Sequence, residues 1–125
     1  MTVTEFLHAA LPVQDLGRSR QFYEGILGLC PSDRPLSFPG LWYSLGKQQL
    51  HLIESSLAPA DALNTERWGR NRHLAFAVTD LGTCQRQLEL AGYPVQPSAS
   101  GRPALFTQDP DGHIIELSQR DADDG

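Results

Sequence analysis

The sequence has few cysteines and no cysteine motif. Its two cysteines, Cys30 and Cys84, lie far apart in the 125 residues and form no Cys-x-x-Cys pair. Disulfide frameworks and thiolate zinc sites need cysteines in more numerous or more closely spaced sets. We therefore expect reduced thiols and a cytoplasmic protein.

Long apolar runs and an excess of basic residues are also absent. No segment approaches the roughly 20 apolar residues that a membrane-spanning helix needs, and the first residues show no signal-peptide pattern. With 15 acidic residues against 10 Lys and Arg, the net charge is −5. We therefore expect no nucleic-acid and no membrane partner, and a globular protein that acts on a small molecule.

What the sequence does contain is a repeat. Residues 72–81 (RHLAFAVTDL) resemble residues 8–17 (HAALPVQDLG). In each segment a histidine opens a strand-like alternation, and an aspartate follows in a position that would cap a helix. His8 and His73 are 65 positions apart, and the same offset leads from His51 to Glu116. The two halves therefore read as copies of one unit.

The expected elements follow the same order in both halves. For the first half we predict a strand at 5–13, a helix at 16–27 that ends at Gly28, an irregular strand or loop at 30–40, and strands at 41–45 and 48–54. For the second half we predict a strand at 72–79, a helix at 81–91 that ends at Gly92, and strands at 93–95, 103–107 and 113–119, the last two joined by a turn at 109–112.

This pattern predicts one α+β domain over residues 1–125. Two tandem βαβββ modules would form a curved, cup-like, eight-stranded mixed sheet with the helices outside. Module 1 is expected at about 5–55 and module 2 at about 72–120, joined by a connector at about 56–71 that contains one helical turn. Residues 121–125 form an acidic tail that we expect to be frayed.

Four side chains share both the repeat offset and the strand parity: His8, His51, His73 and Glu116. Each is expected to point away from the helix-packed face of its strand, so a curved sheet would bring all four to one concavity. Three imidazoles and a carboxylate suit one divalent transition metal (Zn, Ni, Co, Mn or Fe), with positions left for water or substrate. A lone histidine on a strand is more often an ordinary polar residue; the shared offset and parity favour the metal site.

Other residues are candidates for substrate binding. Trp42 and Phe106 would form either an aromatic wall of the pocket or part of the ordinary core. Several arginines lie in loops or at strand ends, where the mouth of a cup is expected, and any of them would suit a substrate carboxylate or phosphate. They are Arg34, Arg70, Arg72 and Arg102.

Several segments together resemble the vicinal oxygen chelate superfamily, which includes glyoxalase I, fosfomycin-resistance enzymes, methylmalonyl-CoA epimerase, extradiol dioxygenases and bleomycin-binding proteins. They are His8 with the following Val13-Gln14-Asp15-Leu16, then 22–29 (FYEGILGL), 72–78 (RHLAFAV) and 109–117 (DPDGHIIEL). These segments bracket almost the entire chain. The resemblance implies a cup of paired βαβββ modules, metal ligands at the four positions named above, and a homodimer.

The resemblance also implies a shared chemistry, in which a substrate binds the metal through adjacent oxygens and the metal acts as a Lewis acid. We therefore expect a metal-dependent lyase or isomerase of the glyoxalase-like type, with Glu116 as ligand and catalytic base. At His51 the chain departs from bacterial glyoxalase I, which resembles it elsewhere but has a glutamate there. One alternative is an Fe(II) extradiol-type dioxygenase, although Phe106 stands where those enzymes have a tyrosine. The other is a non-enzymatic drug- or metabolite-binding (resistance) protein.

Overall fold

The computed structural model describes residues 1–57 and 64–121. Its contacts divide the chain into two compact units, Met1–Pro59 and Ala60–Gly125. Each unit contains one four-stranded sheet of mixed strand direction. The eight strands and the α+β class predicted from the repeat are therefore present, with four strands in each sheet.

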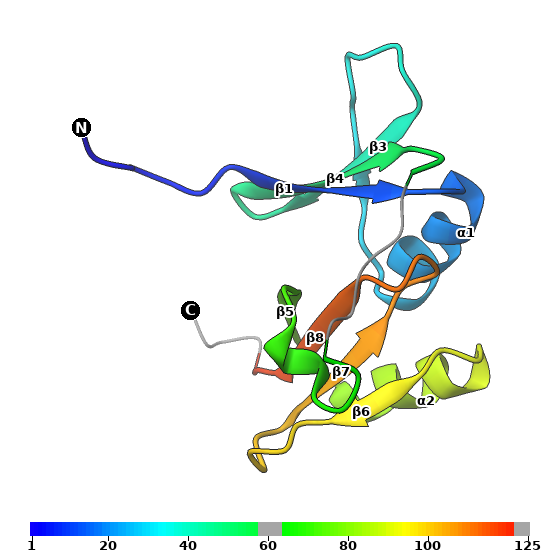
Figure 1. Cartoon of the computed structure of the whole chain (residues 1–125). Coiled ribbons are helices and arrows are strands. Elements are labelled where there is room, and N and C mark those ends of the chain that lie inside the picture. The colour runs from blue at the N-terminus through cyan, green and yellow to red at the C-terminus, as the bar shows by residue number, and fades with distance from the viewer. Residues whose placement is uncertain (58–63, 122–125) are drawn as a thin grey trace. The chain divides into compact units, whose positions relative to one another are not determined.

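The first unit follows the βαβββ order (Figure 1). Its elements are β1 (His8–Val13), α1 (Leu16–Arg20), η1 (Gln21–Ile26), β2 (Pro31–Ser32), β3 (Gly40–Leu45) and β4 (Gln48–Glu54). The strand order in the sheet is β1-β4-β3-β2, in which β1 runs parallel to β4 and the other neighbours are antiparallel.

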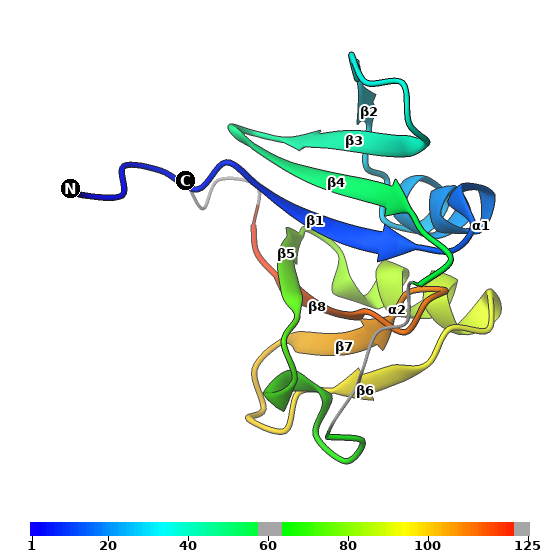
Figure 2. The same ribbon diagram turned by 45° about the horizontal axis from the view of Figure 1, so that its top comes forward.

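The second unit repeats this topology (Figure 2). Its elements are the 3₁₀ helix η2 (Trp68–Arg70), β5 (Leu74–Val78), α2 (Leu81–Leu90), β6 (Val95–Pro97), β7 (Ala104–Gln108) and β8 (Ile114–Gln119). The strand order is β5-β8-β7-β6, and β5 runs parallel to β8. The helical turn predicted in the connector is η2; residues 58–63 of that connector, and all of the predicted acidic tail except Asp121, lie outside the described residues.

The strand register shows that corresponding strands of the two sheets pair in the same way. Ala10 lies opposite His51 in the first sheet, and Ala75 lies opposite Glu116 in the second. On the other side of the same central strands, Trp42 lies opposite His51 and Phe106 lies opposite Glu116. The 65-residue offset predicted from the sequence is therefore confirmed for the pairing of β1 with β4 and of β5 with β8, whereas Trp42 and Phe106 are 64 positions apart.

The helix ends also behave as predicted. The Asp15 carboxylate accepts a hydrogen bond from the amide of Arg18 (3.1 Å), and that of Asp80 accepts from the amide of Thr83 (3.0 Å). Gly28 and Gly92 follow the helices with φ of 73° and 86°, a left-handed conformation that carries little cost only for glycine.

The first predicted strand is too long at its start. It was expected from residue 5, but β1 begins at His8, which pairs with Gln49 near the start of β4. Because the two strands are parallel and β4 begins at Gln48, residues 5–7 have almost no partner strand beside them. One further hydrogen bond extends the pairing: the carbonyl of Leu7 accepts from the amide of Gln49 (3.0 Å). Leu7 itself is 62% exposed. His73 likewise immediately precedes β5 and is not part of it.

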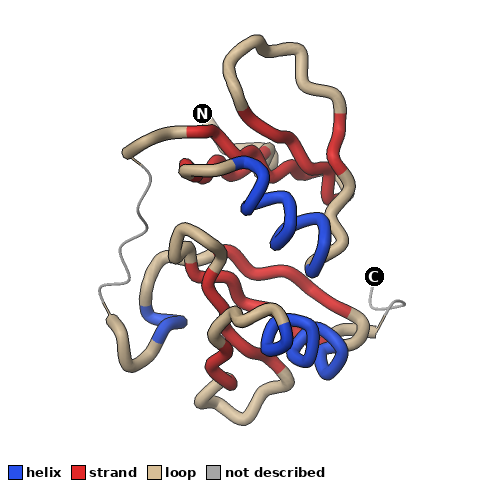
Figure 3. The backbone as a smooth tube through the Cα atoms, turned by 90° about the vertical axis from the view of Figure 1, so that its right-hand side faces the viewer, coloured by secondary structure: helices blue, strands red, loops and turns tan. Residues whose placement is uncertain are grey.

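The predicted helix at 16–27 is present but is not α-helical throughout. α1 gives way at Gln21 to the π-helix η1, and Figure 3 shows the two as one continuous helical segment. The amide of Leu27 donates to the carbonyl of Phe22, five residues earlier, at 3.0 Å. Such a widened turn is not visible in a side-chain pattern of helical period. The segment 30–40, predicted as an irregular strand or loop, contains the two-residue strand β2 followed by a loop that leads to β3 at Gly40.

Each sheet has a core of fully buried side chains shared with its own helix. In the first unit they include Phe22, Tyr23, Tyr43, Leu50 and Leu52, and in the second Leu88, Leu105, Ile115 and Leu117. On β5, half-buried Leu74, Phe76 and Val78 alternate with exposed Ala75 and Ala77, which confirms the predicted parity. In the described part of the chain, no helix has the length and apolar character needed to span a membrane.

Candidate metal site and adjoining cavity

The candidate site of the second unit is built on His73 and Glu116. Nε2 of His73 lies 3.3 Å from Oε1 of Glu116. Glu116 is on the central strand β8, opposite Ala75 of β5, and His73 is two residues before Ala75. Because side chains two residues apart on an extended chain share a face, the strand register brings these two groups together.

The remaining polar atoms of the pair are occupied by neighbours that orient them. Nδ1 of His73 lies 2.7 Å from the carbonyl oxygen of Asn71. A carbonyl only accepts hydrogen bonds, so Nδ1 carries the proton and, in the neutral ring, Nε2 presents its lone pair towards Glu116. The hydroxyl of Ser118 donates to Oε2 of Glu116 at 2.9 Å. Such outer contacts commonly orient metal ligands.

The spacing of the pair fits two ligands of one ion. Two atoms each about 2.1 Å from a metal lie roughly 3.0–3.4 Å apart in octahedral or tetrahedral geometry. The His73–Glu116 distance of 3.3 Å falls in this range. The same distance forms an ion pair when His73 is protonated. The donor set, one imidazole nitrogen and one carboxylate oxygen, suits a divalent transition metal.

The equivalent place in the first unit holds a stack of three rings. The His8 and His51 rings are stacked, with centroids 4.0 Å apart and planes 18° apart. Trp42 lies on the other side of His51, 4.3 Å away and 8° from parallel. Nε2 of His51 lies 2.8 Å from Oε1 of Gln49. His51 is thus held on both ring faces and at one nitrogen.

This stack limits how the two histidines could bind an ion. Burial lowers the pKa of His51, and electrostatic interaction with His8 and Arg34 lowers it further, which favours the neutral ring, the form that ligates metals. An imidazole binds a metal in its ring plane, however, and two nearly parallel planes 4.0 Å apart do not meet at bonding distance. In this side-chain conformation His8 and His51 do not fit as joint ligands of one ion.

The four predicted ligands therefore occur as two pairs, one in each unit. His51 and Glu116 are buried, each 9% exposed. Taken separately, neither unit gathers three or more His, Cys, Asp or Glu side chains as a metal cluster within its described residues.

The predicted substrate-binding residues have different surroundings. Phe106 is 7% exposed and meets the His73 ring edge-on, with centroids 5.5 Å apart. Nη2 of Arg102 lies 4.0 Å from Oε2 of Glu116. Arg34 is engaged in its own loop: it donates to the carbonyls of Leu36 and Phe38, and its guanidinium lies 4.4 Å from the centre of the Phe38 ring.

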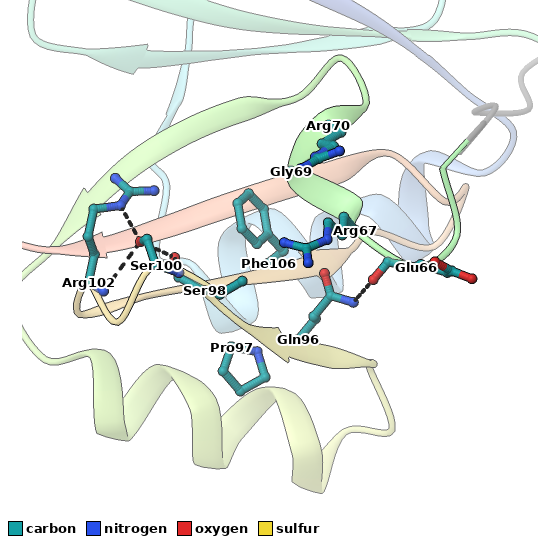
Figure 4. Close-up of a pocket in the computed structure, with 11 residues that line it drawn as sticks. Glu66, Arg67, Gly69, Arg70, Gln96, Pro97, Ser98, Ser100, Arg102 and Phe106 are labelled. Carbon is teal, nitrogen blue, oxygen red and sulfur yellow. Dashed lines mark hydrogen bonds between the residues drawn. The ribbon is translucent and has the colours of Figure 1, made fainter.

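The second unit also contains a cavity of about 740 Å³ (Figure 4). It is lined by Glu66, Arg67, Gly69, Arg70, Gln96, Pro97, Ser98, Ala99, Ser100, Arg102 and Phe106. Arg102 and Phe106, both predicted to bind substrate, connect this cavity to the His73–Glu116 pair. A cavity of about 600 Å³ in the first unit is lined by His8, Trp42, Gln49 and His51 among others.

Sequence reasoning missed four residues that matter here: Gln49, Arg67, Asn71 and Ser118. Gln49 and Ser118 each lie two positions from a predicted ligand, so strand parity was a signal that would have found them. Arg67 and Asn71 belong to the connector, whose path no periodic pattern predicts.

Comparison with known proteins decides the family. Residues 5–117 match the family model described as "Glyoxalase/Bleomycin resistance protein/Dioxygenase superfamily". The chain belongs to this superfamily. The predicted resemblance is thereby confirmed over nearly the whole sequence.

Two relatives of this superfamily member carry enzyme names. The chain is 27% identical to "Glyoxylase I 4" of Arabidopsis thaliana, over 96% of this chain and 73% of that protein. It is 33% identical to "Probable lactoylglutathione lyase" of Synechocystis sp., over 90% of this chain and 93% of that protein.

Solved structures of other proteins share the fold. The fosfomycin resistance protein FosX of Listeria monocytogenes matches with a TM-score of 0.73 at 14% identity, over 99% of this chain and 97% of that one. TnmS3, an antibiotic binding protein from Streptomyces sp., matches with a TM-score of 0.69 at 22% identity, over 95% of this chain and 98% of that one. These likenesses confirm the predicted fold and carry no statement about the reaction.

Proposed function

We propose that this protein is a metal-dependent lyase or isomerase of the glyoxalase-like type. Its substrate would be a small molecule that binds the metal through two adjacent oxygens. The observation that carries the proposal is the His73–Glu116 pair, in which Nε2 and Oε1 lie 3.3 Å apart. Asn71 holds Nδ1 of His73, and Ser118 holds Oε2 of Glu116. The relatives named for glyoxalase I and lactoylglutathione lyase support an enzyme.

The ligand set follows from the pair and from the repeat. His73 and Glu116 would supply two ligands, and His8, the repeat equivalent of His73, would supply a third. We assign His51 the role of holding the His8 ring, because the stacked planes do not converge on one ion. A bound divalent metal would supply Lewis-acid polarisation of the substrate oxygens.

Glu116 is the proposed base. Its Oε1 would remove a proton from the carbon beside the substrate carbonyl. In an isomerisation that proton would exchange with solvent before Glu116 protonates the neighbouring carbon. The Ser118 hydroxyl keeps Oε2 engaged, so the carboxylate presents one defined oxygen. His73, with its proton held on Nδ1 by the Asn71 carbonyl, presents Nε2 on the same side.

Metal analysis tests the first part of the proposal. Protein purified without chelators should contain about one divalent ion per chain, as expected of an open catalytic site. His73→Ala and Glu116→Gln should each lose it, while His113→Gln, which changes a histidine outside the set, should keep it. Metal content that His73→Ala leaves unchanged, or that His113→Gln removes equally, would contradict the ligand assignment.

Turnover in deuterated water tests the second part. Hemithioacetals of 2-oxoaldehydes are suitable substrates, because their isomerisation yields 2-hydroxyacyl thioesters such as lactoylglutathione. We expect deuterium at the neighbouring carbon, which receives the proton and becomes the hydroxyl-bearing carbon of the thioester, because the carbon that loses its proton becomes the thioester carbonyl. Glu116→Gln should abolish this incorporation, while Glu54→Gln should not. Product formed with no solvent deuterium would count against Glu116 as the base.

The same measurements distinguish the other two functions. Bound iron together with oxygen uptake on catechols would support an extradiol-type dioxygenase. Lack of metal binding, with binding of an organic ligand that His73→Ala leaves intact, would support a binding protein, the role that the name of TnmS3 describes for that protein.

We also expect a homodimer in solution, which sedimentation analysis would test.

A further inference from the structure

We propose that the 740 Å³ cavity of the second unit binds an oxyanion, a carboxylate or phosphate group at one end of the substrate, through Arg67, Arg70 and Arg102. The proposal rests on the proposed function only in placing the other end of the substrate at His73 and Glu116. Oxyanion binding in the cavity itself is independent of any metal.

Positive charge is concentrated around this cavity. Three of the ten Lys and Arg residues line it, although the chain as a whole has a net charge of −5. Among the described lining residues Glu66 is the one carboxylate. Neither Arg67 nor Arg70 forms an ion pair with any residue in 1–57 or 64–121, and Arg102 approaches Glu116 only to 4.0 Å. Guanidinium groups bind carboxylates and phosphates through paired hydrogen bonds, so an oxyanion is the complementary ligand.

The segment that carries Arg67 and Arg70 is fixed by two asparagines. The Asn64 amide nitrogen of the main chain donates to Oδ1 of Asn71 (2.8 Å), and Nδ2 of Asn71 donates to the carbonyl of Asn64 (2.8 Å). The main-chain amide of Arg67 donates to Oδ1 of Asn64 at 2.7 Å. Binding to such a pre-formed segment loses less conformational entropy than binding to a free loop.

The same segment is tied to the sheet beneath it. Oε1 of Gln96 accepts from the amide of Trp68 (3.0 Å), and Nε2 of Gln96 donates to the carbonyl of Glu66 (2.9 Å). A Cβ at Gly69 would lie 2.5 Å from the end of the Phe106 ring, so η2 approaches Phe106 this closely only because residue 69 is glycine. Figure 4 shows Phe106 with Arg102 to one side and Arg67 and Arg70 to the other.

Three contacts connect the cavity to the candidate metal ligands. Phe106 lines the cavity and meets the His73 ring edge-on, and Arg102 lines it and approaches Glu116. Asn71 braces the arginine segment with its side chain and holds Nδ1 of His73 with its carbonyl. The cavity is several times larger than one phosphate group, which leaves room for an organic body against Phe106 and Pro97. The substrate class inferred is an organic anion whose charged end is separate from its metal-binding oxygens.

Titration of chelator-treated protein with inorganic phosphate, and separately with succinate, tests the inference. Removal of metal prevents either anion from binding through an ion, and the tighter of the two identifies the preferred group. We expect saturable binding that Arg67→Gln and Arg70→Gln each weaken by about ten-fold, as for loss of a charge-assisted contact. Arg18→Gln, which removes an exposed arginine outside the cavity, should leave the affinity unchanged.

Two results would overturn the inference: wild-type protein that binds neither anion saturably, or a loss in Arg18→Gln equal to that in the cavity variants. Chemical-shift changes in ¹⁵N-labelled protein should centre on residues 66–71 and 96–102. Metal binding measured in parallel separates the two proposals. Phosphate binding retained without metal binding rejects the proposed function alone, and metal binding without anion binding rejects the cavity assignment alone.

Discussion

The His8 and His51 rings lie face to face, 4.0 Å apart between centroids and 18° from parallel. The repeat makes His51 the counterpart of Glu116 and His8 the counterpart of His73. The two halves nevertheless arrange these counterparts differently: His73 and Glu116 point polar atoms at each other, whereas His8 and His51 share ring faces.

This difference predicts unequal effects of the two histidines on metal affinity. We expect His51→Gln to weaken zinc binding by about ten-fold, as for residues that orient a ligand, and His8→Ala to weaken it by more than about a hundred-fold. Calorimetric titration of chelator-treated protein with zinc measures both. A larger loss in His51→Gln than in His8→Ala would mean that the stack opens and that His51 is a direct ligand.

Ser118 is predicted to act through Glu116. Ser118→Ala removes the hydroxyl that holds Oε2, and we expect roughly ten-fold weaker metal binding or turnover as the carboxylate loses its fixed orientation. Ser118→Thr retains a hydroxyl and should recover part of the loss. Ser37→Ala, which changes an exposed serine in a loop of the first unit, provides the matched control.

Gly69 is predicted to be required for the position of η2. In Gly69→Ala the new methyl group would meet the Phe106 ring, and we expect a loss of about 1–3 kcal/mol in the free energy of unfolding, typical of overpacking. Phosphate binding should weaken in the same variant. At Gly25 an added Cβ would meet no atom within 4 Å, so Gly25→Ala should not destabilise the protein. Denaturant unfolding compares the two.

The cap at Asp80 predicts a pH dependence of stability. Hydrogen bonds from the amide and hydroxyl of Thr83 lower the pKa of Asp80. Because the folded-state pKa is below the unfolded one, the stabilisation is complete above the unfolded value of about 3.9 and is lost as the pH falls through the folded pKa.

Asp80→Ala should therefore lower the melting temperature relative to wild type at pH 7, and the difference should shrink as the pH falls below about 4. Thermal unfolding across this range measures it, with Asp33→Ala as an exposed control outside the helices. A difference that stays constant down to pH 2 would show that the charge of Asp80 does not contribute.

Local patterns account for what could be predicted. The strand parity of His8 and His73 and the caps at Asp15 and Asp80 depend on residues a few positions apart, and the 65-residue offset is found by comparing two such local patterns. Period-two alternation and helix capping act over that range, so a single sequence displays them. The π-helical turn at Gln21–Ile26 was missed because its side chains keep a nearly helical spacing.

The sequence by itself determined the repeat, the superfamily resemblance, and which face of each strand carries the candidate ligands. Only the tertiary structure decided which neighbours those ligands have. Strand register placed His73 beside Glu116 and Trp42 over His51, and the path of the connector placed Arg67 and Arg70 at the same cavity as Arg102. Register and loop path depend on contacts between residues far apart in the chain, and no local pattern records them.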